Sequence, residues 1–262
     1  MTAVVSADGT TVARTVTGSG PAVVLVDGAL CHRAFGPAQG LAAQLAAHHT
    51  VHTYDRRGRG ESGDTAPYAV EREIEDLAAV IAAAGGTAAV YGISSGAALA
   101  LRAAERGLGI TRLAVYEPPF ATEDGQRERF TGYAAGLAAD LAEGRPGDAV
   151  ARFMAFVGAP EPVVEQMRSS PAWPAFEAVA PTLAYDAAVL DAPAGAGVPM
   201  AALAGLAVPV LVLAGGASPE LLQAPARAVA AVPGAEYLAL PEQTHDVAPE
   251  ALAPELLKFF AG

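Results

Sequence analysis

A serine held between two glycines, in the stretch Gly92-Ile93-Ser94-Ser95-Gly96, is the first sign of chemistry in this chain. The residues before it are apolar and predict a strand, and the alanine- and leucine-rich residues after it predict a helix. Strand, G-x-S-x-G and helix in this order are typical of a nucleophile elbow, a sharp turn that exposes a serine hydroxyl. Glycines two residues before and after the serine avoid the clashes that side chains would make there. We therefore expect Ser94 to be a nucleophile rather than part of a purely structural turn.

Two backbone N–H groups are predicted to stabilise the oxyanion that attack by this serine would generate. Ser95 directly follows the nucleophile, so its N–H is the first expected donor. The loop Asp27-Gly28-Ala29-Leu30 follows an apolar strand, and we expect the Ala29 N–H to be the second donor, with Gly28 allowing close approach. Asp27 would bring a carboxylate near the site, where a structural hydrogen-bonding role is the simplest interpretation.

These residues need a framework that brings them to one edge of a sheet. Apolar runs and turn signals predict eight strands, at residues 3–5, 11–16, 22–26, 50–54, 87–91, 112–116, 208–213 and 236–240. Helical spacing alternates with them, at residues 37–47, 70–84, 95–106, 219–231 and 247–260. The alternation predicts an α/β fold with a mostly parallel eight-stranded sheet and helices on both faces.

The segment between residues 118 and 199 interrupts this alternation. It has no convincing strand and many prolines, and helices are predicted at residues 126–143, 147–157 and 162–168. We therefore expect a core of residues 1–118 and 199–262, with a helical cap of residues 119–198 inserted after the sixth strand. The side chains expected to contact substrate are Leu30 and His32 near the oxyanion loop and Phe120, Phe153 and Trp173 in the cap.

Composition limits the possible partners. The chain is 52% hydrophobic and 17% charged, with a formal net charge of −12, as expected of a globular protein with a sizeable core. Its only basic cluster is Arg56, Arg57 and Arg59, so neither nucleic acid nor an anionic membrane is an expected partner. A small-molecule substrate is expected instead, with no metal or cofactor; the oligomeric state is left open.

The cysteine count and the first ten residues predict where in the cell the protein is located. One cysteine, Cys31, cannot form an internal disulfide, and the first ten residues lack a secretory pattern, so a cytoplasmic protein is expected. The uncharged residues 200–217 contain Pro209 and are better explained as a short helix and a buried strand than as a membrane span.

Several segments resemble the α/β-hydrolase fold superfamily, in its serine-nucleophile branch, and together they cover nearly the whole chain: "VVLVDGALC", "YDRRGRGES", "VYGISSGAA", "VPVLVLAGG" and "QTHDVAPEALAPELLKFF". Members typically have His-Gly where this chain has Asp27-Gly28, and often histidine where it has Ile93. Neither departure removes a backbone donor. The loop containing the arginine cluster is familiar in the superfamily, and we expect it to tie neighbouring loops together without catalysing anything.

The resemblance implies a base and an acid for the serine. His245 stands between the last strand and the final helix, where the superfamily carries its catalytic histidine. The usual aspartate after the seventh strand is replaced by Ser218. Some members hold the acid at the end of the sixth strand, where this chain has Glu117, and we expect it to complete the triad. The alternatives for the acid are Asp186, Asp191 and Glu220.

The function expected from these residues is hydrolysis of a carboxylic ester, lactone or thioester of a small, largely apolar molecule through an acyl-enzyme. Two other classes share the fold. A lyase or cyclase would use the same serine and histidine for proton transfer alone, and a ligand-binding protein would need neither. The intact Ser94 and His245 pair argues against a pure binding protein.

Overall fold

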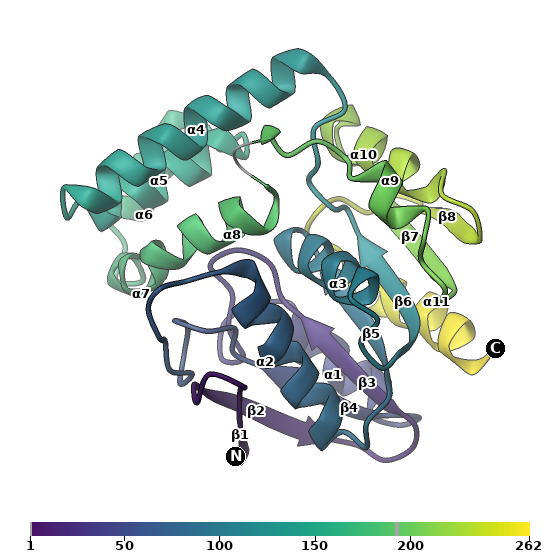
Figure 1. Cartoon of the computed structure of the whole chain (residues 1–262). Helices are drawn as coiled ribbons and strands as arrows, with labels where there is room; N and C mark the ends of the chain where they lie inside the picture. Colours follow the sequence, from purple (N-terminus) through teal and green to yellow (C-terminus); the bar gives the residue numbers. More distant parts are fainter. Residues whose placement is uncertain (1, 192–193) are drawn as a thin grey trace.

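The computed structural model describes residues 2–191 and 194–262; Met1 and residues 192–193, which belong to the predicted core and cap, lie outside the described part. Within it, one sheet of eight strands has the order β1-β2-β4-β3-β5-β6-β7-β8 (Figure 1). β1 and β2 pair antiparallel, as do β2 and β4, and the remaining pairs are parallel. The strands are β1 (Thr2–Val5), β2 (Thr11–Thr17), β3 (Ala22–Val26), β4 (Thr50–Tyr54), β5 (Ala88–Ile93), β6 (Ile110–Tyr116), β7 (Val210–Gly215) and β8 (Ala235–Leu240).

The central strands are apolar along their whole length because both faces of the sheet are covered. β5 and β7 are buried at every position, which matches the continuous hydrophobic runs of parallel sheets. Since β3 to β8 all run parallel, their carboxyl ends meet at one edge, where α/β sheets form their sites. The expected eight-stranded α/β-hydrolase fold is confirmed.

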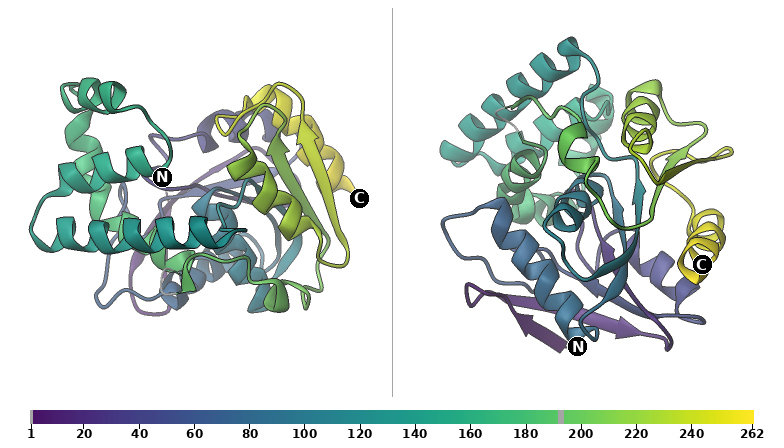
Figure 2. Two further views of the ribbon diagram at one scale, coloured as in Figure 1. Left: turned by 90° about the horizontal axis from the view of Figure 1, so that it is seen from above. Right: turned by 45° about the vertical axis from the view of Figure 1, so that its right-hand side comes forward.

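Helices cover the two faces unequally. α1 and α11 pack on one face with the second of two apolar clusters, and α2, α3 and α10 pack on the other with the larger cluster (Figure 2). These helices and the short α9 are α1 (Ala38–Leu45), α2 (Val70–Ala83), α3 (Ser95–Glu105), α9 (Met200–Leu203), α10 (Glu220–Ala230) and α11 (Pro249–Ala261). In α3 small buried alanines let the helix lie directly against the sheet.

The segment predicted to form a cap lies on the side toward which the parallel strands point (Figure 1). It contains the three expected helices, α4 (Asp124–Ala142), α5 (Pro146–Phe156) and α6 (Glu161–Arg168), followed by three that were not predicted: α7 (Trp173–Val179), the 3-10 turn η1 (Ala180–Thr182) and α8 (Leu183–Val189). Among the described residues, none of the helices is both long and apolar enough to span a membrane.

Candidate active site

Ser94 occupies a strained turn between β5 and α3. Its backbone has φ 57° and ψ −127°, a conformation that residues with a side chain rarely adopt. The Ser94 N–H donates to the carbonyl of Tyr116 at 2.9 Å, which holds the turn against the end of β6. Strain of this kind persists only where the surroundings impose it, and it is concentrated at functional sites.

The two flanking glycines are required by close backbone contacts. A Cβ atom at Gly92 would lie 2.5 Å from the carbonyl oxygen of Gly96, and a Cβ atom at Gly96 would lie 2.3 Å from that of Val26. Both distances are shorter than any real contact allows. The G-x-S-x-G spacing is thus explained by the tightness of the turn that presents Ser94.

A buried glutamate holds the histidine. Glu117 Oε2 lies 2.6 Å from Nδ1 of His245, and its other oxygen accepts the N–H of Gly215 at 2.8 Å. Glu117 is fully buried, whereas the His245 side chain is 42% exposed. Because a carboxylate can only accept, Nδ1 carries the proton and Nε2 is left free to accept one.

Because Glu117 binds the imidazole from the end of β6, no carboxylate is needed at residue 218, where the superfamily usually has aspartate. Glu117 directly follows β6 with a positive φ of 45°, and its N–H donates to the carbonyl of Leu213 on β7 at 3.0 Å. From there the long side chain crosses the end of β7 and reaches the loop after β8. Ser218 is buried, and its hydroxyl has no hydrogen-bond partner within the described chain.

Hydrogen bonds from the ends of β6 and β7 fix the loop that carries His245. The Tyr116 hydroxyl donates to the carbonyl of Thr244 at 2.6 Å, and the Ala217 N–H donates to the carbonyl of Gln243 at 2.9 Å. The ends of β6 and β7 therefore determine where the imidazole lies.

The predicted oxyanion donors lie on the other side of the serine. A Cβ atom at Gly28 would be only 3.0 Å from Cβ of Ser94, so this backbone passes close to the Ser94 side chain. Ala29 and Ser95 line the same cavity as Ser94. Within residues 2–191 and 194–262, the N–H groups of Ala29 and Ser95 have no acceptor, which leaves both free for a ligand.

Two cavities meet at the serine and the histidine. The larger, of about 560 Å³, extends along the oxyanion loop and under the predicted cap, and the smaller, of about 240 Å³, extends toward α10. Both are lined by Ser94, Pro119, Phe130, Phe156, Val157 and His245. A substrate carbonyl beside Ser94 would thus have apolar space on two sides.

The substrate-contacting side chains predicted from sequence divide into two groups. Phe153 lines the larger cavity and Phe120 the smaller. Leu30, His32 and Trp173 line neither: Leu30 is buried at a positive φ, His32 pairs with Phe35, and the Trp173 indole N–H donates to Glu177 at 3.0 Å. Residues that the sequence did not suggest take their place, among them Cys31, Phe35, Tyr133 and Asp246.

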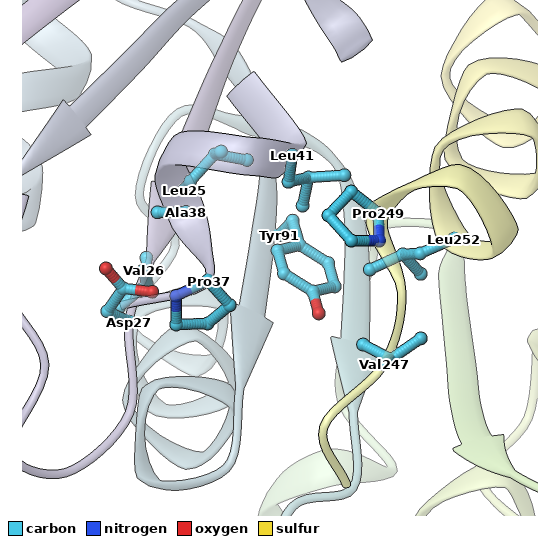
Figure 3. A pocket seen from close by; sticks show the side chains of 10 residues that line it. All are labelled: Leu25, Val26, Asp27, Pro37, Ala38, Leu41, Tyr91, Val247, Pro249 and Leu252. Atoms are coloured by element: carbon cyan, nitrogen blue, oxygen red, sulfur yellow. The ribbon is translucent and has the colours of Figure 1, made fainter. Parts of the chain in front are cut away.

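Asp27 lies at the end of β3, beside a cavity of about 10 Å³ on the α1 and α11 face (Figure 3). The neighbouring side chains are mostly aliphatic, and Figure 3 shows the Asp27 carboxyl beside Pro37. Burial raises the pKa of Asp27 to about 7, although Arg59 and Arg56 oppose the shift. Burial, reinforced by Asp27, also raises the pKa of the Cys31 thiol to about 12, so this cysteine is not a thiolate nucleophile.

Two of the three alternative acids have other partners. Asp186, on α8, accepts hydrogen bonds from Arg56, Arg59 and the Ser95 hydroxyl, and Glu220 pairs with Arg227. The basic cluster of the sequence is therefore buried in ion pairs rather than spread over a surface. No group of three His, Cys, Asp or Glu side chains in the described ranges is arranged to hold a metal ion.

Solved structures that resemble this chain include hydrolases of the same fold. An alpha/beta hydrolase from Sphaerobacter thermophilus is 52% identical, covers 99% of this chain and 100% of its own, and superposes with a TM-score of 0.88. Two more distant structures share the fold: a thermophilic esterase from Thermogutta terrifontis (23% identity, 98% and 94% coverage, TM-score 0.68) and the enol-lactonase from Burkholderia xenovorans (22%, 100% of both chains, TM-score 0.68).

Among curated proteins, none matches the chain significantly. The model of the "Alpha/beta hydrolase family", however, matches residues 19–255, a range that contains the strained serine, the glutamate and the histidine. The chain therefore belongs to the alpha/beta hydrolase family.

Proposed function

We propose that the protein is a cofactor-independent serine hydrolase that cleaves a carboxylic ester, lactone or thioester of a small, largely apolar molecule. The observation that carries the proposal is the 2.6 Å hydrogen bond from Nδ1 of His245 to Oε2 of the buried Glu117, with His245 lining the cavity that also contains the strained Ser94. Serine, histidine and a buried carboxylate in these relations form the arrangement that activates a hydroxyl for acyl transfer.

The residues have distinct roles in the proposed reaction. Nε2 of His245 takes the proton of Ser94 as Oγ attacks the acyl carbon, and the resulting imidazolium is stabilised by Glu117. The N–H groups of Ala29 and Ser95 bind the oxyanion. Collapse of the tetrahedral intermediate releases the alcohol or thiol with the proton from His245. Water, deprotonated by His245, then attacks the carbonyl carbon of the acyl-enzyme. The bond to Oγ breaks, the carboxylic acid leaves, and His245 returns the proton to Ser94.

The cavity walls support the proposed substrate class. Phe130, Phe153 and Phe156 are among the aromatic side chains around the two cavities, so small apolar groups would fit beside the serine. The relatives named as an esterase and an enol-lactonase agree with hydrolysis of such bonds, although at 22–23% identity they share only the fold.

The test is covalent labelling with a fluorophosphonate, followed by peptide mapping and by turnover of p-nitrophenyl esters. We expect label on Ser94 in the parent, none in Ser94→Ala, and continued label on Ser94 in Ser95→Ala. His245→Ala should lose at least about 10³-fold in kcat. Label on Ser95, or no label at all, would contradict the proposal. If the parent takes the label on Ser94 but the unlabelled parent forms products without an added water, the activity is that of a lyase or cyclase instead.

A further inference from the structure

Two buried arginines lie directly behind the loop that carries one proposed oxyanion donor. Arg59 Nη1 donates to the carbonyl oxygen of Gly28 at 2.6 Å, and Arg56 Nη1 lies 3.3 Å from that of Asp27. Both arginines are only 1% exposed, so water hardly competes for these bonds. Neither has a part in the proton transfers described above.

Both arginines pair with one carboxylate of the predicted cap, and Arg56 pairs in addition with Glu73 on α2. The Asp186 oxygens accept from Arg59 Nη2 at 2.9 and 2.8 Å and from Arg56 Nη1 at 2.8 Å. Oδ1 also accepts the Ser95 hydroxyl at 2.7 Å. Burial favours the neutral acid, but the charges of Arg59 and Arg56 prevail and keep the pKa of Asp186 below its usual range. One carboxylate thus holds both the arginine behind Gly28 and the side chain of Ser95.

We propose that Arg59 and Asp186 are positioning residues for the oxyanion hole. Arg59 orients and polarises the peptide that joins Gly28 to Ala29, and Asp186 holds Arg59 and Ser95 in place from α8. The inference rests on the proposed serine-hydrolase function and adds to it the support of its two N–H donors.

The geometry of the peptide group explains how Arg59 acts. The Gly28 carbonyl and the Ala29 N–H belong to one planar trans peptide, so they point in opposite directions. A guanidinium that fixes the carbonyl on one side therefore fixes the N–H on the other, and Ala29 lines the cavity with Ser94.

The charge of Arg59 acts on the same peptide. A hydrogen bond from a charged donor polarises the group and strengthens its N–H as a donor, by about 10–30% for one bond in a chain. A stronger donor matters most when the substrate oxygen has become negative, so the effect is larger in the transition state than in the bound substrate.

The effect should therefore appear in kcat rather than in KM. Arg59→Met is expected to lower kcat for p-nitrophenyl esters by about 10- to 50-fold, less than the 10²–10³ of losing a donor itself, with KM within about threefold. Inhibition by a phenylboronic acid, which forms a tetrahedral adduct with serine, should weaken in proportion to kcat/KM. Arg59→Lys should retain part of the rate, because an ammonium keeps the charge without the planar fork.

Arg57 provides a matched control in the same loop. It is fully buried and pairs with Asp76 at 2.8 Å and Asp8 at 3.0 Å, and it donates to the carbonyl of Arg72, but it makes no hydrogen bond to the oxyanion loop within the described residues. Arg57→Met should lower the unfolding temperature at least as much as Arg59→Met while keeping kcat within about twofold of the parent.

The outcomes separate this inference from the proposed function. A parent labelled at Ser94, with Arg59→Met and Arg59→Lys both at parental kcat, would overturn the inference alone. An equal loss of kcat in Arg57→Met would also overturn it. A parent that takes no label would overturn both proposals. If Arg59→Met does not fold, Asp186→Asn serves instead: a kcat loss of about fivefold or more at unchanged KM supports the inference, and parental kcat refutes it.

Discussion

The two sides of Ser94 are built in opposite ways. On one side the half-exposed His245 is held by the single carboxylate of Glu117. On the other, two arginines and two carboxylates are all buried and are joined by ion pairs of 2.7–2.9 Å: Arg56, Arg59, Glu73 and Asp186.

The difference follows from what each side does in the proposed reaction. The histidine must gain and lose a proton in every turnover, so a single carboxylate partner and access to the cavity suit it. The oxyanion donors must already be in place when charge develops, because any reorganisation at that moment would raise the barrier. A buried ion network is expensive to assemble, but once formed it cannot move without leaving a charge unpaired.

The largest expected effect comes from the histidine side. Glu117→Gln should lower kcat by up to about 10⁴-fold, because the amide no longer favours the tautomer with a proton on Nδ1. The change in unfolding free energy should stay near 1 kcal/mol, since the glutamine oxygen can still accept the Gly215 N–H. Steady-state kinetics and urea unfolding measure the two quantities. Near-parental kcat would show that Glu117 is not the triad acid.

The opposite pattern is expected from the arginine side. Glu73→Gln removes the carboxylate that binds Arg56 at 2.7 and 2.9 Å, and it should cost about 3 kcal/mol of unfolding free energy while kcat falls no more than about tenfold. Glu71→Gln is the control on the same helix, because its ion pair with Arg106 is half exposed and is worth less than about 1 kcal/mol. Equal stability losses in the two variants would contradict the contrast drawn above.

Asp27 is not one of the four paired groups of this network, and its raised pKa predicts that the unfolding free energy depends on pH. The pKa of this acid is near 3.8 in the unfolded chain and about 7 in the folded protein. The contribution of Asp27 to the unfolding free energy is therefore fully present below about pH 4 and falls by roughly 1.4 kcal/mol per pH unit up to pH 7. Asp27→Asn removes this slope. Relative to the parent, it should gain roughly 2–3 kcal/mol between pH 5 and pH 8, measured by urea unfolding at both values. A constant difference would refute the prediction.

The smallest expected effect is a rescue on the histidine side. Adding Ser218→Asp to Glu117→Gln restores a carboxylate at the position that is usual in the superfamily, in place of a buried hydroxyl without a partner among the described residues. We expect recovery of about tenfold in kcat, because the new acid must find its hydrogen bond without the supporting Gly215 N–H. Ser218→Asn in the same background is the control, and recovery with asparagine would show that charge is not the cause.

The sequence was enough to predict the elements that present the serine and to expect a glutamate in an unusual place. A strand and a helix on either side of two glycines leave little choice for the turn, and the missing aspartate at residue 218 directs attention to Glu117. These inferences depend on local patterns or on a gap in a known pattern. The hydrogen bond at 2.6 Å agrees with the expected acid and base pair.

The arginine network could not be predicted in the same way. The residues of α8 are few and lack a clear apolar period, so no helix was expected there, and Asp186 was considered only as an alternative acid. Its partners lie 127 and 130 residues away in the chain. Leu30 and His32 were expected at the substrate because they lie near the oxyanion loop, and Trp173 because it lies in the cap, but neither placement determines which way a side chain turns.

The meeting of two cavities at one serine has a consequence for the order of events in turnover. In an acyl-enzyme the acyl part is tethered to Ser94, whereas the alcohol part is free to depart. In the proposed acyl-enzyme, departure of the alcohol would free space beside Ser94 and His245 that water could enter. A substrate with a large alcohol part would thus block its own second step until that part diffuses away, and the exit of the first product would then set the rate.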